Sequence, residues 1–366
     1  MDTFFRIFGI YPLQRIGKEE LKATPKCRFW FRYVFTTVWV QIAMAMPMGF
    51  IFYNEATPRE YIGSFVTSLA ATSIDKITFV VTFLTQPLLH YTCLKHLEKV
   101  KKCMMNLQHD FNTKVKIDIE DENPLKFYSI LSIWLILEVG ILLSGFPGMF
   151  YKMQSQLSLS FVATNVALLG MTLLQVFLLT TPFYFIFVYL ESTINISNHC
   201  RSIKKQSNGV ILQESKLLLQ ALKEFNKMSG PFLFWIISRD FIFEIVMGFF
   251  IYVKTNTLLF DGPTPWQDWL IYFSFVLFFI RTIFLLFIFC TLSEDVVSEV
   301  QELKTKVIDM ELQNGQTNSI IQKLDEFKGF TAYGYFTLNQ SLLTGMTTNF
   351  ATFLVILIQF KQAEGI

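Results

Sequence analysis

Seven ionisable residues lie inside long apolar stretches of the chain, where their types and spacing could do chemistry. A charge in an apolar environment is costly, so such residues are either structural ion pairs or functional groups. Asp240 and Glu244 are four residues apart and share one helical face, whereas Arg239 does not face Asp240 directly. Arg281 needs an acid, and Glu138 or Glu244 lies at a similar depth. The predicted buried charge network consists of Asp75, Glu138, Asp240, Glu244 and Arg281, with Lys76 and Arg239 beside it.

No enzymatic arrangement accompanies these charges. None of the histidines is paired with cysteines or carboxylates at the spacing of a metal site. The sequence also lacks a Gly-x-Ser-x-Gly nucleophile motif and a glycine-rich phosphate loop after a strand. We therefore expect no enzyme activity, no metal site and no cofactor. The histidines are His90, His96, His109 and His199.

Long apolar blocks must position the charges. The chain has 366 residues, of which 52% are hydrophobic and only 16% charged, whereas soluble domains carry about 25% charged residues. Several blocks exceed the roughly 20 residues that cross a bilayer core. The pattern predicts an all-α membrane protein with seven transmembrane helices, at residues 29–53, 61–89, 127–151, 161–190, 232–258, 266–291 and 338–360.

The basic residues orient these spans. Of the 31 Lys and Arg residues, 23 fall in the N-terminal segment and in alternate loops, and only four fall in the remaining connecting segments or at the outer end of a span. Lys and Arg gather on the cytoplasmic side of membrane proteins. We therefore expect a cytoplasmic N-terminus, an extracellular C-terminus and long cytoplasmic loops.

Two of the long inner loops carry helical apolar stripes. In 293–312 the apolar residues recur every three or four positions, and charged residues occupy the other faces. The segment 211–228 has a similar stripe. These helices pack either within one subunit or between subunits, and we expect them to extend into a cytoplasmic anchor. The residues of the first stripe are Val296, Val300, Leu303, Val307 and Met310, and those of the second are Leu212, Leu219, Leu222 and Phe225.

The last apolar segment is too long for one span. Residues 329–360 contain no charge, and as one helix they would extend about 48 Å, against a bilayer core of about 30 Å. We expect a break at Gly334. The part beyond it has an uncharged polar stripe, which suits either helix–helix hydrogen bonds or the wall of a water-filled pore. The stripe consists of Gln340, Thr344, Thr348 and Thr352, with Gln359 near the end.

The end of this segment resembles a known signature. Residues 352–360 read Thr-Phe-Leu-Val-Ile-Leu-Ile-Gln-Phe, which is similar to the insect gustatory receptor motif of Thr-Tyr, five apolar residues and Gln-Phe. Phe353 replaces the motif's tyrosine and lacks its hydroxyl. Residues 334–343 also resemble the family's approach to this helix, and residues 5–13 do so weakly. The family has seven spans in the same inverted orientation.

The resemblance implies a ligand-gated, non-selective cation channel. In the gustatory and odorant receptor families, four subunits place their last helices around one pore, and the inner helices form an anchor. The chain then divides into residues 1–28, a cytoplasmic N-terminus; 29–290, a ligand-binding bundle of six spans; 291–337, the anchor helices; and 338–366, the pore helix with a short extracellular tail. Implied pore or gate residues are Gln340, Thr344, Thr348, Thr352, Val355, Gln359 and Phe360. Phe360 is either an apolar constriction or an interfacial aromatic anchor.

The expected partners are a small-molecule tastant, identical or related subunits and membrane lipids, without nucleic acid, in the plasma membrane of a sensory neuron. Ser64, Asn165 and Trp269 are ligand-binding candidates by depth, because they supply hydrogen bonds and a stacking face. Two alternatives remain open, an odorant-type subunit that needs a co-receptor and a non-channel membrane receptor or scaffold. The sequence does not name the ligand.

Overall fold

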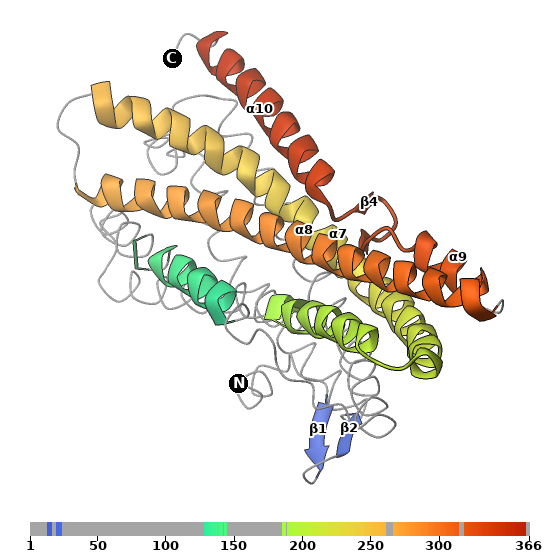
Figure 1. Ribbon diagram of the computed structural model, residues 1–366. Helices are drawn as coiled ribbons and strands as arrows, with labels where there is room; N and C mark the ends of the chain where they lie inside the picture. Colours follow the sequence, from blue (N-terminus) through green and yellow to red (C-terminus); the bar gives the residue numbers. More distant parts are fainter. Residues whose placement is uncertain are drawn as a thin grey trace.

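The computed structural model describes residues 13–16, 20–23, 128–141, 143–144, 185–187, 189–260, 266–314 and 318–363 (Figure 1). The predicted spans 29–53 and 61–89 lie outside the described residues, as does most of 161–190. The described part is mostly helical, as an all-α class requires. It also contains two short β-hairpins that the sequence did not predict.

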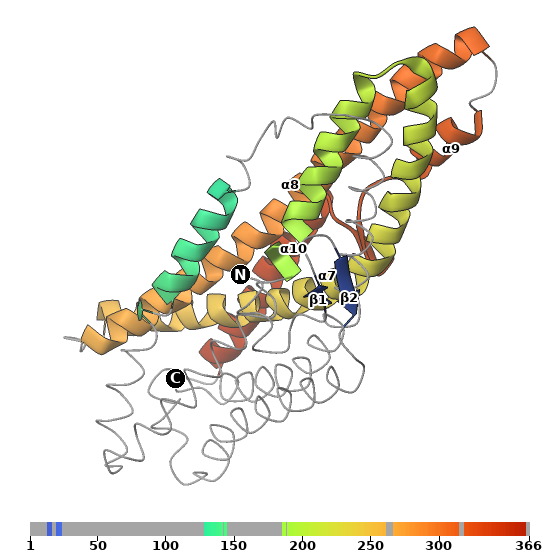
Figure 2. The ribbon, with the colours of Figure 1, turned by 90° about the horizontal axis from the view of Figure 1, so that it is seen from below.

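Two long antiparallel helices form the body of the described part, α7 (Asn208–Phe260) and α8 (Trp266–Asn314). They lie side by side (Figure 1), and two further helices, Tyr128–Ile141 and 189–204, lie along the same body. Each long helix joins two predicted elements, an inner helix and a span, without interruption. In α7 the stripe segment 211–228 and the predicted span 232–258 form one helix, and Pro231 between them does not end it. A proline in a helix removes one backbone hydrogen bond and favours a bend, and α7 is bent in Figure 2.

The segment after α8 folds back before it forms the last helix. It contains α9 (Asn318–Glu326), the hairpin of β3 (Thr331–Ala332) and β4 (Phe336–Thr337), and α10 (Gln340–Ala363). In the hairpin, Thr331 pairs with Thr337 and Ala332 with Phe336, both antiparallel. The turn needs left-handed backbone at Tyr333 (φ 56°) and Gly334 (φ 80°), which glycine adopts without steric cost. The break expected at Gly334 is confirmed.

A second hairpin lies near the N-terminus. Its strands are β1 (Leu13–Ile16) and β2 (Glu20–Ala23), and Leu13 pairs with Ala23 while Ile16 pairs with Glu20. These residues belong to the predicted cytoplasmic N-terminus, for which no strands were expected.

The main core joins the 189–204 helix to the N-terminal half of α7, the C-terminal half of α8 and α9. Its centre is aromatic, with ring centroids of Tyr189 and Phe289 5.2 Å apart and those of Phe225 and Phe330 also 5.2 Å apart. The apolar stripe predicted on α8 is buried within this single chain, at Val296, Val300, Leu303 and Val307. Of the two arrangements considered for the stripe, the structure therefore shows packing within one subunit.

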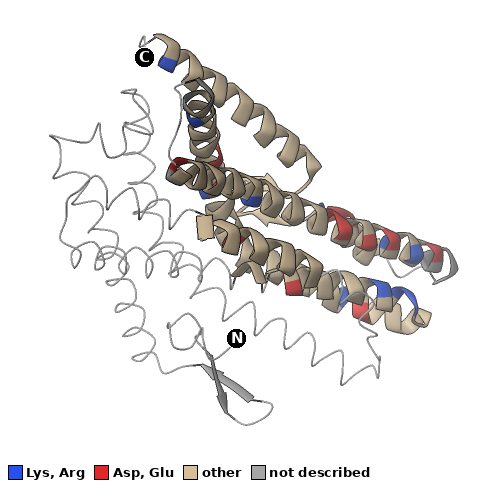
Figure 3. Ribbon diagram, turned by 90° about the vertical axis from the view of Figure 1, so that its left-hand side faces the viewer, with Lys and Arg blue, Asp and Glu red and all other residues tan. Residues whose placement is uncertain are grey.

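Charged residues gather toward the end of the α7–α8 body that carries α9 (Figure 3). Two described helical stretches are long and apolar enough to cross a membrane, Asp268–Asp309 of α8 and Gln340–Ala363. Tyr128–Ile141 is apolar but shorter. Less than half of the most apolar part of Asp268–Asp309 is buried within the protein, and none of the most apolar part of α10 is buried.

Candidate functional site

The helix α10 packs on its own chain along one face only. Leu354 and Leu357 contact a small cluster on α7, and the ring of Phe350 lies 5.3 Å from that of Phe279 on α8. A Cβ at Gly248 of α7 would lie 2.7 Å from Phe350, so the absence of a side chain there permits the close approach of the two helices. No residue of α10 is buried, and its opposite face is exposed along the whole helix.

The polar stripe lies on this exposed face. Thr344 donates its hydroxyl hydrogen to the carbonyl oxygen of Gln340 at 3.1 Å, and Thr348 and Thr352 each donate to the carbonyl four residues earlier at 3.0 Å. The donors are therefore satisfied inside the helix itself, while each hydroxyl oxygen keeps a lone pair free to accept. The exposed side of α10 thus presents a row of hydrogen-bond acceptors without charge.

The end of α10 continues this face with larger side chains. Val355 is 52% exposed and Gln359 is exposed in line with it, four positions on. Phe360 is 58% exposed, but one residue along a helix turns the side chain by about 100°. Val355 and Gln359 therefore continue the exposed face that carries the polar stripe, and Phe360 lies at the edge of this face.

Asn339, just before α10, and Glu294 of α8 hold the base of α10. Asn339 is the N-cap, because its Oδ1 accepts from the backbone N–H of Leu342 at 2.9 Å. Glu294 of α8 accepts from the N–H of Gln340 at 2.8 Å. The negative charge of a carboxylate also interacts favourably with the helix dipole at a helix N-terminus. The first turn of α10 is therefore attached to α8.

The hairpin before α10 is held in the same way. The Ser293 hydroxyl on α8 accepts from the N–H of Phe330 at 3.2 Å, and Asn226 Oδ1 on α7 accepts from the N–H of Thr331 at 2.8 Å. These contacts were not predictable from local sequence, because they join segments that are 37 and 105 residues apart.

Arg281 forms its ion pair with Glu138 rather than with Glu244. Its Nη1 lies 2.9 Å from Glu138 Oε1, and both residues are only 6% exposed. The Arg281 guanidinium also lies over the ring of Phe278, at 4.2 Å from the centroid. Depth alone left the two acids equivalent, and the packing of the Tyr128–Ile141 helix on α8 decides between them.

The expectation that Arg239 does not face Asp240 was wrong. Arg239 donates from Nε and Nη2 to Asp240 Oδ1, at 2.8 and 2.6 Å. Adjacent Cβ atoms diverge by about 100° on a helix, but the arginine side chain is long enough to reach round it. Asp240 is thus neutralised within α7, whereas Glu244 has no hydrogen bond or ion pair to any described residue.

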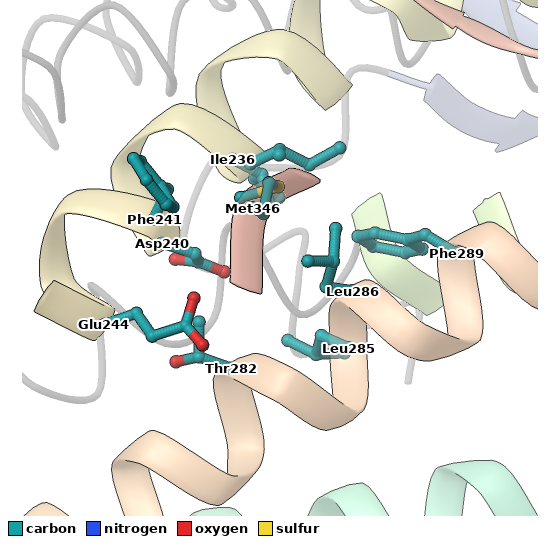
Figure 4. A pocket seen from close by; sticks show the side chains of 10 residues that line it. Ile236, Asp240, Phe241, Glu244, Thr282, Leu285, Leu286, Phe289 and Met346 are labelled. Atoms are coloured by element: carbon teal, nitrogen blue, oxygen red, sulfur yellow. The ribbon is translucent and has the colours of Figure 1, made fainter. Parts of the chain in front are cut away.

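Asp240 and Glu244 both line a pocket between α7, α8 and α10. Figure 4 shows the two carboxyl groups beside one another at one end of it, with the side chain of Thr282 next to that of Glu244. Apolar side chains form the rest of the wall, including Phe289 of α8 and Met346 of α10. The pocket lies directly behind α10. Its other lining residues are Ile236, Ile237, Phe241, Leu285 and Leu286.

Comparison with known proteins decides the family. The family profile described as 7tm Chemosensory receptor matches residues 3–364. The chain belongs to this chemosensory receptor family.

The structure of the insect olfactory receptor OR5 from Machilis hrabei in complex with eugenol is similar, with a TM-score of 0.69, 15% identity, and coverage of 98% of this chain and 96% of that chain. A second OR5 structure has a TM-score of 0.62 at 14% identity and covers 98% of both chains. No curated protein matches the chain. At these identities the likeness to OR5 shows the fold.

Of the receptor's three ligand-binding candidates, the described residues include only Trp269. Its side chain is partly exposed near the start of α8 and lies edge-on to Tyr272, with 6.1 Å between ring centroids. Close by, Lys254 Nζ lies 3.2 Å from Asp268 Oδ2, an ion pair at the ends of α7 and α8 for which the sequence analysis proposed no partner. Ser64, Asn165 and Asp75 lie outside the described residues.

Among the described residues, another cluster of ion pairs lies at the far end of the body. Glu299 accepts from Arg201 and from Lys204, both at 2.6 Å, and Lys204 also contacts Glu302. Burial raises the pKa of Glu299, but the hydrogen bonds from the two cations outweigh it, so the pKa is lowered overall. In the same region burial lowers the pKa of His199 to about 4, although Glu214 lies 3.9 Å away. His199 is therefore neutral at physiological pH, which favours a structural role.

Proposed function

We propose that this receptor is a gustatory receptor that acts as a ligand-gated, non-selective cation channel. Four identical or related subunits surround a central pore, and α10 of each lines it. The observation that carries the proposal is the exposed face of α10. The helix is apolar enough to span a membrane, yet its own chain covers only one side of it.

The chemistry of the exposed face favours a lumen over lipid. A helix that faces only lipid gains nothing from a row of acceptor oxygens, whereas cations that pass through a pore exchange water for such oxygens. Thr344, Thr348 and Thr352 present oxygens whose hydrogens are already bonded inside the helix. Beyond them, Val355, Gln359 and the edge residue Phe360 form the constriction.

The distribution of basic residues and several exposed apolar side chains support the proposed membrane placement. Ile136 on the Tyr128–Ile141 helix is 70% exposed, and Phe273 and Phe287 on α8 are each about half exposed. Such residues are stable when lipid covers them. We propose a plasma-membrane receptor of a sensory neuron, with a cytoplasmic N-terminus and an extracellular C-terminus.

The proposed stimulus is a small tastant that binds among the outer halves of the first six spans. Machilis hrabei OR5 is solved with the small molecule eugenol, which supports a small-molecule ligand for this receptor. Trp269 offers a stacking face at the start of α8, and Ser64 and Asn165 complete the proposed set.

The constriction can be tested by basal conductance normalised to surface protein. Phe360→Ala would widen an apolar ring and Phe360→Ser would also wet it, so each should increase the current without ligand. The matched control is Phe353→Ser, because Phe353 lies two turns earlier on the same side and its ring is 6.5 Å from that of Phe241 on α7. An unchanged basal current in both Phe360 variants, with normal ligand responses, removes Phe360 from the gate.

The same recordings separate the alternatives. A subunit of the odorant type would give current only when a co-receptor is expressed with it. A non-channel receptor or scaffold would reach the surface and give no ligand-dependent current in either case.

A further inference from the structure

The pocket between α7, α8 and α10 has an uneven distribution of charge. Asp240 is neutralised by Arg239 through Oδ1 alone, while its Oδ2 is buried without a hydrogen-bond partner among the described residues. Glu244 is 6% exposed, points into the pocket (Figure 4) and has no partner in the described part of the chain. One carboxylate charge is therefore left uncompensated in a largely apolar cavity.

The polar groups at this end of the pocket are all acceptors. The Thr282 hydroxyl donates its hydrogen to the carbonyl of Phe278 at 3.0 Å, so only its oxygen lone pair remains available to the pocket. Carboxylate and hydroxyl oxygens are hard ligands, which suit hard cations rather than transition metals. Two helices, α7 and α8, thus bring oxygen ligands to one point without bringing a donor to it.

The charge and the size of the pocket select the kind of cation. Because Arg239 offsets Asp240, the site carries a net charge of about −1, which a monovalent ion neutralises. Divalent ions such as calcium take 6–8 oxygen ligands, often with several carboxylates. The described residues hold no cluster of three His, Cys, Asp or Glu side chains. The cavity has a volume of about 10 Å³, which is roughly the space of one water-sized sphere and therefore leaves room for a single ion held directly by the protein oxygens.

We propose that this pocket binds one monovalent metal cation, with Glu244, Asp240 Oδ2 and the Thr282 hydroxyl as its protein ligands. The ion compensates the charge of Glu244 and couples α7 to α8. Since Met346 of α10 closes the same pocket, the occupied site also supports the packed face of α10. The binding site itself does not depend on α10 being a pore helix.

The test measures the thermal stability of the purified full-length receptor in detergent. Chloride salts of sodium, potassium and choline are compared at constant ionic strength and pH. A ligand that binds only the folded state raises the Tm as its concentration rises. We expect sodium or potassium to raise the Tm by a few degrees over choline, with saturation. Equal Tm values in all three salts would overturn the proposal.

Variants identify the site and separate it from general salt effects. Glu244→Gln removes the uncompensated charge, so in choline it should be at least as stable as the wild type, while the gain from sodium or potassium is lost. Thr282→Val should weaken the gain, and Thr282→Ser should retain it. The control is Glu224→Gln, an exposed acid on the same helix α7, which should leave the gain unchanged.

A further comparison distinguishes a metal ion from a proton. If Glu244 is instead kept neutral by protonation, the Tm in choline will rise as the pH falls and will not respond to sodium or potassium at any pH, which would overturn the proposal. The experiment requires no current. A failure of the Phe360 recordings therefore leaves the cation site standing, and the absence of a cation effect leaves the channel proposal standing.

Discussion

The buried charges show how far single residues could be interpreted from sequence. Their positions inside apolar blocks were sufficient to mark Glu138, Asp240, Glu244 and Arg281 as paired or functional, because burial of a lone charge is costly. The choice of partner was not accessible, since it depends on how the Tyr128–Ile141 helix packs on α8. The Arg239–Asp240 pair was missed for a different reason, the reach of a flexible side chain, which helical spacing does not describe.

Arg281→Ala should strongly impair folding or gating. The substitution leaves Glu138 buried without its cation, and removal of one partner from a buried pair typically costs about 3–5 kcal/mol. We expect a large loss of surface protein, measured by labelling intact cells. The double variant Arg281→Glu with Glu138→Arg exchanges the charges and should recover part of the loss. Surface levels and responses equal to those of the wild type in Arg281→Ala would show that this pair contributes little.

At the scale of elements, the length of residues 329–360 was enough to predict a break, and Gly334 was the correct position. The hairpin itself was not predictable. β3 and β4 have two residues each, and their placement depends on Asn226 of α7 and on Ser293 of α8, far away in the sequence. Long periodic helices are specified locally, whereas a short connection of this kind is specified by what it packs against.

Gly230→Ala should disturb the hairpin that leads into α10. A Cβ at this position would lie 3.0 Å from both the carbonyl oxygen of Thr331 and the N–H nitrogen of Tyr333. Those atoms belong to backbone that Asn226 holds in place, so they cannot move aside as a side chain would. We expect a lower Tm of the purified receptor and a shifted ligand concentration for half-maximal current.

Gly209→Ala provides the control on the same helix. An added Cβ there meets nothing within 4 Å, and replacement of glycine by alanine in a helix is favourable by up to about 1 kcal/mol. The control should therefore be neutral or slightly stabilising. If Gly230→Ala behaves like Gly209→Ala, the hairpin has more freedom than its hydrogen bonds indicate.

At the scale of the whole molecule, composition was enough to predict a helical membrane protein, and the motif at residues 352–360 was enough to predict a chemosensory receptor, with which the family match agrees. What they could not predict is the continuity of α7 and α8. Composition separates an apolar span from an amphipathic helix. The backbone hydrogen bonds of a helix, however, continue across such a change in composition when no residue prevents it. In α7 even Pro231 does not interrupt the helix.

The orientation of the receptor gives a prediction at this scale. An epitope added after Ile366 should be stained on intact cells, because the distribution of basic residues places the C-terminus outside. An epitope added before Met1 should be stained only after permeabilisation. The reverse pattern would contradict the orientation and, with it, the proposed arrangement of the pore.

The attachment of α10 to α8 has a mechanical consequence. α8 runs from Trp266 to Asn314 without a proline, so we expect it to move as one rigid helix. Glu294, which caps α10, lies about 42 Å along it from Trp266. Beyond Glu294, the buried residues from Val296 to Val307 hold α8 in place in the core. A push of roughly 2 Å at the Trp266 end therefore tilts α8 by about 3°. The base of α10 rotates together with α8. A small displacement at the Trp266 end of α8 therefore reaches α10 as a rigid-body rotation.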